Sequence, residues 1–352
     1  MKFNRVVRTI ALFSNISNNI GESKISLNGI IEITKADMNN VNDIILKMAQ
    51  SQTELIPKIS SYLSCAGGKR IRPMLTIASS LFFEYAGNDA HVKLAAAVEF
   101  MHTATLLHDD VVDESDMRRG AKAARKIWGN QASVLVGDFL LGQAFTLMVE
   151  ADSMEALAVL AKAAAVIAEG EVMQLVASRS LDSTIDDYFT IINAKTAQLF
   201  TAATSVGAII SKAPSKSVEA ISEYGQKIGI AFQLVDDILD YSGNAGDLGK
   251  NIGDDFREGK ITLPVLLCIE KADKAEKDFW QKALCEGHNS SSSFEQALAL
   301  LNKYDSLSKT ILLAKKYGED AKRALLSIDG DVNLKVRKTL LDVVDFCVQR
   351  VG

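Results

Sequence analysis

The sequence predicts an all-α fold, and three observations support this prediction. Proline is scarce, with 4 residues in a chain of 352, so few positions interrupt a helix,. Apolar residues make up 48% of the chain, enough for a large core, and they recur at helical spacing over long stretches,. No fixed-period repeat and no linker divides the chain into regions of different composition. We therefore expect one helical domain, residues 34–352, behind a loosely ordered N-terminal extension, residues 1–33.

The helical pattern begins after about residue 34 and continues almost to the end of the chain. The stretches 92–112, 132–149 and 154–176 are rich in Ala or Leu and apolar on nearly all sides, which is typical of central helices,. The pair Gly67 and Gly68 separates the second and third helices. The expected helices cover residues 36–48, 54–63, 71–85, 92–112, 132–149, 154–176, 188–210 and 218–241, with further amphipathic helices between residues 294 and 351.

Residues 242–260 interrupt this pattern with five glycines and charges of both signs. A long polar loop inside a compact domain usually has a function. We expect residues 243–260 to be mobile without ligand and to close over a bound ligand as a lid. A second break, residues 286–293, is rich in Ser and is more typical of a surface loop.

Charge and composition exclude several classes of protein. The formal net charge is -5 and no long basic stripe occurs, so nucleic acid is not an expected partner,. No run of about 18 apolar residues occurs, so no transmembrane helix is predicted, and a peripheral membrane contact stays open. The cysteines are scattered without metal-ligand spacing, as expected for reduced thiols in a cytosolic protein. They are Cys65, Cys268, Cys285 and Cys347.

The N-terminal residues 1–19 contain Lys2, Arg5 and Arg8 but no acidic residue. This composition is compatible with a weak amphipathic targeting segment. The apolar run at residues 10–13 is too short for a signal peptide. We expect a cytoplasmic location, with an organellar matrix as the alternative if residues 1–20 are a targeting segment.

The pattern DDxxD occurs twice, each time within an apolar helical stretch. Its first and last Asp are separated by four residues and lie about one turn apart on one helix face. Clustered carboxylates in apolar surroundings repel one another and are costly to desolvate unless cations neutralise them. Two facing clusters therefore predict a site that binds a polyanion through bridging Mg²⁺. The carboxylates are Asp109, Asp110, Asp113, Asp236, Asp237 and Asp240.

Basic residues complete the predicted site. The segment GGKRIRP, residues 67–73, places three bases after the glycine pair at a helix start, and RRG follows the first aspartate cluster at residues 118–120. Further lysines stand in a helical pattern, at Lys195, and in the glycine-rich loop, at Lys250 and Lys260. Arg and Lys both suit phosphate oxygens. The sequence thus predicts two phosphorylated ligands, one held through Mg²⁺ and one directly by bases. His102 is either a ligand contact or a buried core residue.

These motifs resemble those of the trans-isoprenyl diphosphate synthases, in particular the long-chain octaprenyl, solanesyl and decaprenyl diphosphate synthases. Five motifs stand in the family's order between about residues 53 and 264: GGKRIRP, HTATLLHDDVVDESDMRRG, KTAQLF, FQLVDDILDY and GKNIGDDFREGKITLP. The resemblance implies an isoprenoid-synthase helical bundle around a deep central apolar cavity. It also implies a homodimer and Mg²⁺, three ions in family members.

The resemblance implies a role for each motif residue. Isopentenyl diphosphate would contact Lys69, Arg72, His102 and Arg119. The allylic diphosphate would contact Arg118, Lys195, Thr196, Gln233, Lys250 and Lys260. Asp109, Asp113 and Asp236 would bind Mg²⁺ together with Asp240, and these first three carboxylates with Lys195 are the expected catalytic residues.

The implied activity is repeated addition of isopentenyl diphosphate to an allylic diphosphate such as farnesyl diphosphate, supplying the side chain of a quinone such as ubiquinone. Ala104 and Thr105 lie one turn before Asp109, where helical side chains stand beside the growing tail. Bulky aromatics here stop growth early in the resembling family. Both residues are small, which predicts a long product of about eight to ten isoprene units.

Three alternatives remain at this stage. The first is a short-chain farnesyl or geranylgeranyl diphosphate synthase. The second is a terpene cyclase, which shares one aspartate motif but usually replaces the second and lacks an isopentenyl diphosphate site. The third is an inactive partner subunit of a heteromeric synthase, in which aspartate clusters tend to be lost. The two intact clusters and the GGKRIRP segment favour an active synthase.

Overall fold

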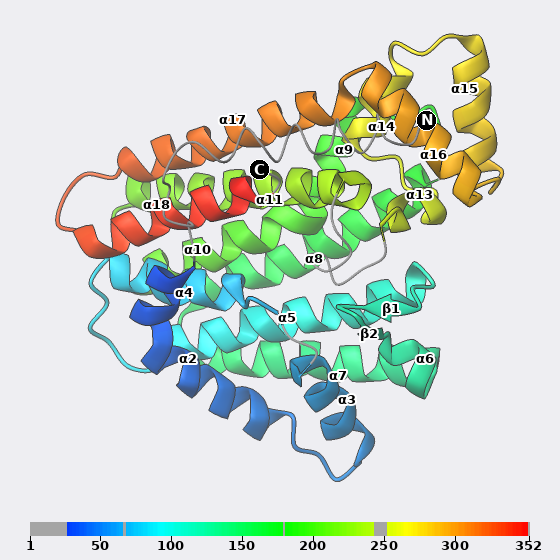
Figure 1. The fold of residues 1–352 in the computed structure, drawn as a ribbon. Helices are drawn as coiled ribbons and strands as arrows, with labels where there is room; N and C mark the ends of the chain where they lie inside the picture. Colours follow the sequence, from blue (N-terminus) through cyan, green and yellow to red (C-terminus); the bar gives the residue numbers. More distant parts are fainter. Residues whose placement is uncertain (1–26, 66–67, 179, 243–251, 351–352) are drawn as a thin grey trace.

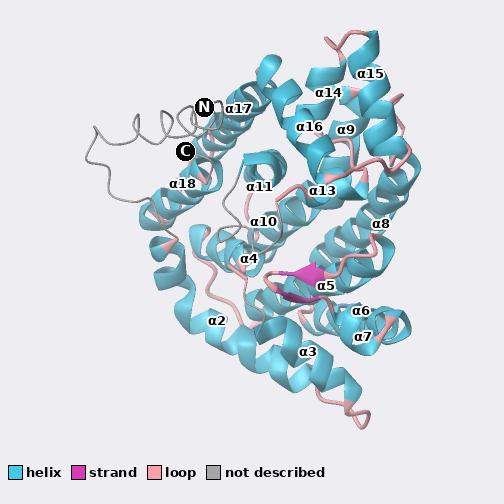
Figure 2. Cartoon of the chain, turned by 45° about the vertical axis from the view of Figure 1, so that its right-hand side comes forward, coloured by secondary structure: helices cyan, strands magenta, loops and turns pink. Residues whose placement is uncertain are grey.

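The structure is a computed structural model that describes residues 27–65, 68–178, 180–242 and 252–350. The basic N-terminal segment, most of the glycine-rich loop with Lys250, and Gly67 lie outside the described residues. Within them the chain is helical apart from one small hairpin of β1 (Met117–Arg118) and β2 (Ala121–Lys122), shown in Figure 2. The prediction of an all-α fold is confirmed.

The helices follow one another with short connections (Figure 1). In chain order they are α2 (Asn28–Met48), α3 (Leu55–Cys65), α4 (Ile71–Phe82), α5 (Ala90–Val112), α6 (Ala124–Trp128), α7 (Asn130–Glu150), α8 (Met154–Ala177), α9 (Ile185–Ile192), α10 (Gln198–Ile210), α11 (Ser215–Ser242), α13 (Asp254–Glu258), α14 (Leu263–Ile269), α15 (Lys274–Trp280), α16 (Ser291–Lys303), α17 (Ser306–Leu326) and α18 (Leu334–Gln349). Two π-helical turns, Asn193–Ala197 and Gln281–Cys285, extend α9 and α15.

Besides small shifts at helix ends, three features differ from the predicted pattern. Helix α2 begins at Asn28, six residues before the expected domain boundary, because Ile30 is buried against apolar residues of α4 and α18. The helix predicted over residues 188–210 is broken by the π-helical turn, which we call the π-turn. The predicted loop over residues 242–260 contains the short helix α13.

Helix α5 lies at the centre of the molecule and packs against α2, α4, α7 and α10 (Figure 1). Its middle is a run of fully buried small residues, Ala95, Ala96 and Ala97, which lets the neighbouring helices approach closely,. Since nearly every side of α5 is covered, its aspartate motif comes at the end of a rigid core helix.

Helix α11 is the second internal support of the site, packed between α10 and α17. Glycines make this close packing possible. A Cβ at Gly225 would lie 2.7 Å from the carbonyl oxygen of Phe200, and a Cβ at Gly229 would lie 2.5 Å from the Cα of Ala197. The second aspartate motif follows these glycines on the same helix and is therefore held firmly against α10 and the π-turn.

Helix α7 is long and apolar enough to cross a membrane by length and composition alone. Its most apolar 18-residue window is 44% buried inside the structure, where α7 packs against α5. The sequence did not suggest a span because Gly137, Asp138 and Gly142 interrupt its apolar residues. Packing against α5 accounts for the apolar residues on the buried side of α7,.

Candidate active site

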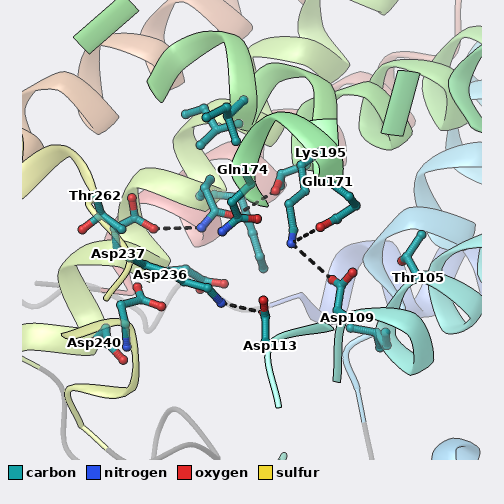
Figure 3. Close-up of a pocket in the computed structure, with 18 of the residues that line it drawn as sticks. Thr105, Asp109, Asp113, Glu171, Gln174, Lys195, Asp236, Asp237, Asp240 and Thr262 are labelled. Carbon is teal, nitrogen blue, oxygen red and sulfur yellow. Dashed lines mark hydrogen bonds and ion pairs between the residues drawn. The ribbon is translucent and has the colours of Figure 1, made fainter. Parts of the chain in front are cut away.

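A large cavity lies between α5 and α11, the two helices that carry the aspartate motifs, and Figure 3 shows side chains on its wall. Its volume is about 700 Å³. The predicted site residues that line it are Lys69, Arg72, His102, Thr105, Asp109, Asp113, Arg118, Arg119, Lys195, Thr196, Gln233, Asp236, Asp237, Asp240 and Lys260. Residues as distant in sequence as Lys69 and Lys260 thus share one cavity.

The outer carboxylates of the first cluster point into the cavity and face lysines from other elements. Asp109 Oδ2 lies 3.5 Å from Lys195 Nζ, and Asp113 Oδ2 accepts a 2.7 Å hydrogen bond from Lys260 Nζ. Burial alone would raise the pKa of Asp113, but the ammonium groups of Lys260 and Lys195 lower it. Asp113 is therefore ionised at neutral pH, the form that binds a cation.

The second cluster faces the first from α11 (Figure 3). Asp236 Oδ1 lies 2.9 Å from Arg350 Nη1, and the guanidinium of Arg350 stacks on Phe232 at 4.8 Å from the ring centroid. Asp240 accepts the backbone N–H groups of Asp254 and Asp255 at 3.2 Å each. Asp240 thus holds the first turn of α13 at the cavity edge.

Asp237 belongs to a buried hydrogen-bond network. It accepts hydrogen bonds from Tyr188 Oη and, at 2.8 Å, from Gln233 Nε2. Gln233 Oε1 in turn accepts one from Thr196 Oγ1 at 2.8 Å. Burial and the charge of Asp255 raise the pKa of Asp237 to about 8, although the two hydrogen bonds act in the opposite direction. The network links the second aspartate cluster to the π-turn.

The π-turn carries Lys195 and Thr196 at the cavity wall. Single π-helical turns inside α-helices occur frequently at functional sites. Lys195 Nζ donates a 2.6 Å hydrogen bond to Glu171 Oε2 on α8. Burial and the neighbouring Asp109 raise the pKa of Glu171 to about 7, against the opposing charge of Lys195.

Arg72 on α4 and His102 on α5 lie next to each other on the cavity wall. Arg72 stacks on Phe200, 4.3 Å from the ring centroid, and its Nη1 lies 3.4 Å from His102 Nε2. Burial lowers the pKa of Arg72 to about 10, so the side chain remains charged at neutral pH. Burial and the charges of nearby arginines lower the pKa of His102 well below its usual range. The His102 imidazole is therefore neutral.

Arg119 and Lys69 flank Arg72. Gly68 has a steric role, because a Cβ at this position would lie 2.5 Å from Arg119 Nη1. Arg119 itself sits at the tip of the β1–β2 hairpin with a left-handed backbone, φ 52°. Lys69 Nζ lies 4.5 Å from the ring centroid of Phe346 on α18. These bases form a cationic wall suited to a diphosphate.

Two predicted residues lie away from the cavity wall. Asp110 is fully buried and accepts a 2.8 Å hydrogen bond from Arg118 Nε, so it holds the arginine that lines the cavity. Ala104 is 2% exposed and packs in the apolar core, whereas its neighbour Thr105 lines the cavity. Helical geometry explains both cases, since adjacent residues point about 100° apart.

Sequence reasoning missed Glu171 and Gln174 on α8, Tyr188 on α9, Glu99 on α5 and Arg350 after α18, all of which line the cavity. A signal existed for Glu171 and Glu99, because each is a carboxylate within an apolar helical stretch. Nothing in the local pattern distinguishes Arg350, which reaches the cavity only through the packing of α18.

Known proteins match this chain over most of its length. The family model described as polyprenyl synthetase matches residues 53–301. The octaprenyl diphosphate synthase of Escherichia coli is 41% identical over 325 residues, 92% of this chain and 99% of that protein. A polyprenyl synthase structure from Caulobacter crescentus, complexed with calcium and isoprenyl diphosphate, is 46% identical with a TM-score of 0.89 and covers 94% of this chain and 100% of that one. A decaprenyl diphosphate synthase structure from Rhodobacter capsulatus is 45% identical with a TM-score of 0.88, covering 93% and 100%.

Proposed function

Because the chain belongs to the polyprenyl synthetase family and is a long-chain polyprenyl diphosphate synthase, we propose that it extends farnesyl diphosphate with isopentenyl diphosphate. We propose that the product is an all-trans chain used as the side chain of a quinone such as ubiquinone. The observation that supports this most is the single cavity in which both aspartate clusters face the cationic wall of Lys69, Arg72 and Arg119.

The donor set of the cavity fits Mg²⁺. Its acidic lining consists of carboxylates, the hard oxygen ligands that Mg²⁺ prefers, and Mg²⁺ often binds one or two carboxylates together with substrate phosphates. Among the described residues no group of three His, Cys, Asp or Glu side chains forms a ready metal site. The Caulobacter crescentus relative, whose structure holds calcium and isoprenyl diphosphate, supports a divalent ion, and we propose three Mg²⁺.

We propose that Asp109 on α5, Asp113 directly after α5, and Asp236 and Asp240 on α11 would hold these ions, which would neutralise charge on the departing diphosphate,. Asp237 would support them through its hydrogen bonds with Tyr188 and Gln233. Asp110, the remaining carboxylate of the first motif, would act by holding Arg118.

The bases divide between the two substrates. Lys195, Lys260 and Arg118 are proposed to bind the allylic diphosphate, with Thr196, Gln233 and Lys250 as further contacts. Lys69, Arg72, Arg119 and the neutral His102 are proposed to hold isopentenyl diphosphate. Both reactants are thereby oriented, and the cavity limits access of water to the allylic cation. The double bond of isopentenyl diphosphate attacks this cation, and the proton lost is passed to the departing diphosphate.

Purified chain incubated with farnesyl diphosphate, Mg²⁺ and isopentenyl diphosphate tests the proposal. Condensation should occur with this chain alone and should require isopentenyl diphosphate. Product formed from farnesyl diphosphate without isopentenyl diphosphate would indicate a cyclase. Activity that appears only after a second subunit is added would indicate a partner subunit instead.

We propose that two copies associate through the outer face of α7 and α8. This face exposes large apolar side chains along both helices, among them Leu135, 67% exposed, and Val176, 78% exposed. The other members are Val134, Phe145, Val149, Met154, Val172 and Leu175. Large exposed apolar side chains gathered on two neighbouring helices are typical of a subunit interface,.

Introducing charge on this face should separate the copies. Leu135→Glu and Val176→Glu are each expected to sediment as monomers where the parent sediments as a dimer, because an interface does not tolerate an unpaired buried carboxylate. Leu312→Glu, at an exposed position of α17, is the matched control and should remain dimeric. A monomeric parent, or a dimeric Leu135→Glu variant, would contradict the proposed interface.

We propose a cytoplasmic location with peripheral membrane contact when the apolar product is released. Fractionation of cells that express the full chain would test it. The chain should appear in the cytoplasmic fraction, and its recovery from an organellar matrix would favour a targeting role for residues 1–20.

A further inference from the structure

Glu171 is a cavity carboxylate outside both aspartate motifs. It lies on α8, where its Oε2 accepts a 2.6 Å hydrogen bond from Lys195 Nζ. The same Nζ lies 3.5 Å from Asp109 Oδ2, so the ammonium group sits between two carboxylates from different helices (Figure 3). The side chains of Glu171 and Lys195 are 24% and 20% exposed, so water screens their attraction only in part,.

The backbone of Lys195 is fixed as tightly as its side chain. A Cβ at Gly170 would lie 2.9 Å from the backbone nitrogen of Lys195 and 2.8 Å from the Cβ of Ala194. From the opposite side, a Cβ at Gly229 would lie 2.5 Å from the Cα of Ala197. The π-turn is therefore clamped between the backbones of α8 and α11. Gly170 and Glu171 are consecutive residues of α8. The first contacts the main chain of Lys195, and the second binds its ammonium group.

We propose that Glu171 is a positioning residue that holds Lys195 in place for the allylic diphosphate. This inference rests on the role proposed above for Lys195. A free lysine side chain has several rotatable bonds and loses rotamer entropy whenever it is fixed. Glu171 fixes it before the substrate arrives, so little reorganisation remains when charge develops on the leaving group.

If Glu171 positions Lys195, its removal has a kinetic signature that the loss of a merely structural residue lacks. In its ion pair with the Lys195 ammonium group, the Glu171 carboxylate places negative charge next to an anion site, and this charge opposes diphosphate binding by Coulomb repulsion,. Removing the charge should leave ground-state binding unchanged or tighter, while the orientation of Lys195 in the transition state is lost. The expected change is thus in kcat, with no loss of affinity.

The test is Glu171→Gln, which keeps the size and a hydrogen-bond acceptor but removes the charge. We expect kcat to fall by about 100-fold, the cost typical of displacing a reacting group by an ångström. The Kd of farnesyl S-thiolodiphosphate with Mg²⁺, measured by titration calorimetry, should not rise by more than about threefold. Glu223→Gln, at an exposed position of α11, is the matched control and should change neither quantity. A folded Glu171→Gln enzyme with kcat within about threefold of the parent would overturn the proposal.

A double-mutant cycle with Lys195→Ala shows whether Glu171 acts through Lys195. If it does, Glu171→Gln should lower kcat by less than about twofold in the Lys195→Ala background. A further loss of about 100-fold would show that Glu171 acts independently, and the proposal would be wrong. Failure of the proposed function is distinguishable, because the parent enzyme itself would then fail to elongate farnesyl diphosphate.

Discussion

Asp109→Ala and Asp236→Ala are each expected to lower kcat by about 10³-fold or more. The two carboxylates come from α5 and α11 and face the cavity from opposite sides. Without either one, the charge that develops on the departing diphosphate loses part of its stabilisation by the metal ions. The loss falls on the transition state, so saturating Mg²⁺ should not restore turnover.

The measurement is single-turnover kinetics at saturating substrates and Mg²⁺, with circular dichroism to confirm the fold. Asp278→Ala, at an exposed position of α15 far from the cavity lining, is the matched control and should retain parental turnover. Turnover of a folded Asp109→Ala or Asp236→Ala enzyme within about tenfold of the parent would contradict the assignment of the metal-binding carboxylates.

Ala104→Tyr is expected to shift the products from about eight to ten isoprene units to about three or four, while early condensations continue. The structure places Ala104 in the packed core beside Thr105, which lines the cavity. A phenol at residue 104 must therefore displace neighbouring groups, and overpacking typically costs about 1–3 kcal/mol of stability. Some of the displaced groups, Thr105 among them, are expected to move into the cavity and narrow it.

Thr105→Tyr separates the direct effect from the indirect one. Its side chain enters the cavity from the wall, so it should shorten the product at least as strongly as Ala104→Tyr and with less loss of stability. Thr105→Ser is the conservative control and should leave the product ladder unchanged. The readout is chromatography of the products from proteins whose fold is confirmed by circular dichroism. If folded Ala104→Tyr and Thr105→Tyr both gave the parental product ladder, other residues would have to end chain growth.

The sequence predicted those site residues that belong to a short local motif. The DDxxD spacing and the basic segments identified residues that the fold brings to one cavity, from Lys69 on the approach to α4 to Lys260 after α13. The apolar, Ala-rich composition of residues 92–112 predicted α5 with its C-terminal boundary correct. Each of these features depends on the spacing of residues within one helix or segment, and this spacing is visible in the sequence.

Features that depend on packing between elements were missed. The π-turn at Lys195 lies against α8 at Gly170 and against α11 at Gly229, and no period in the sequence reports these contacts. The start of α2 at Asn28 depends on the apolar surface of α18, more than three hundred residues away in sequence. Arg350 reaches Asp236 for the same kind of reason.

The length of the product made by the purified chain distinguishes a long-chain synthase from a short-chain one. The chain is incubated with farnesyl diphosphate, labelled isopentenyl diphosphate and Mg²⁺, and the dephosphorylated products are separated by reversed-phase chromatography. We expect a ladder that ends at about eight to ten isoprene units, because the small residue Thr105 on the cavity wall leaves room for a growing tail,. A ladder that ends at about four units, with isopentenyl diphosphate still in excess, would show a short-chain synthase and contradict the account.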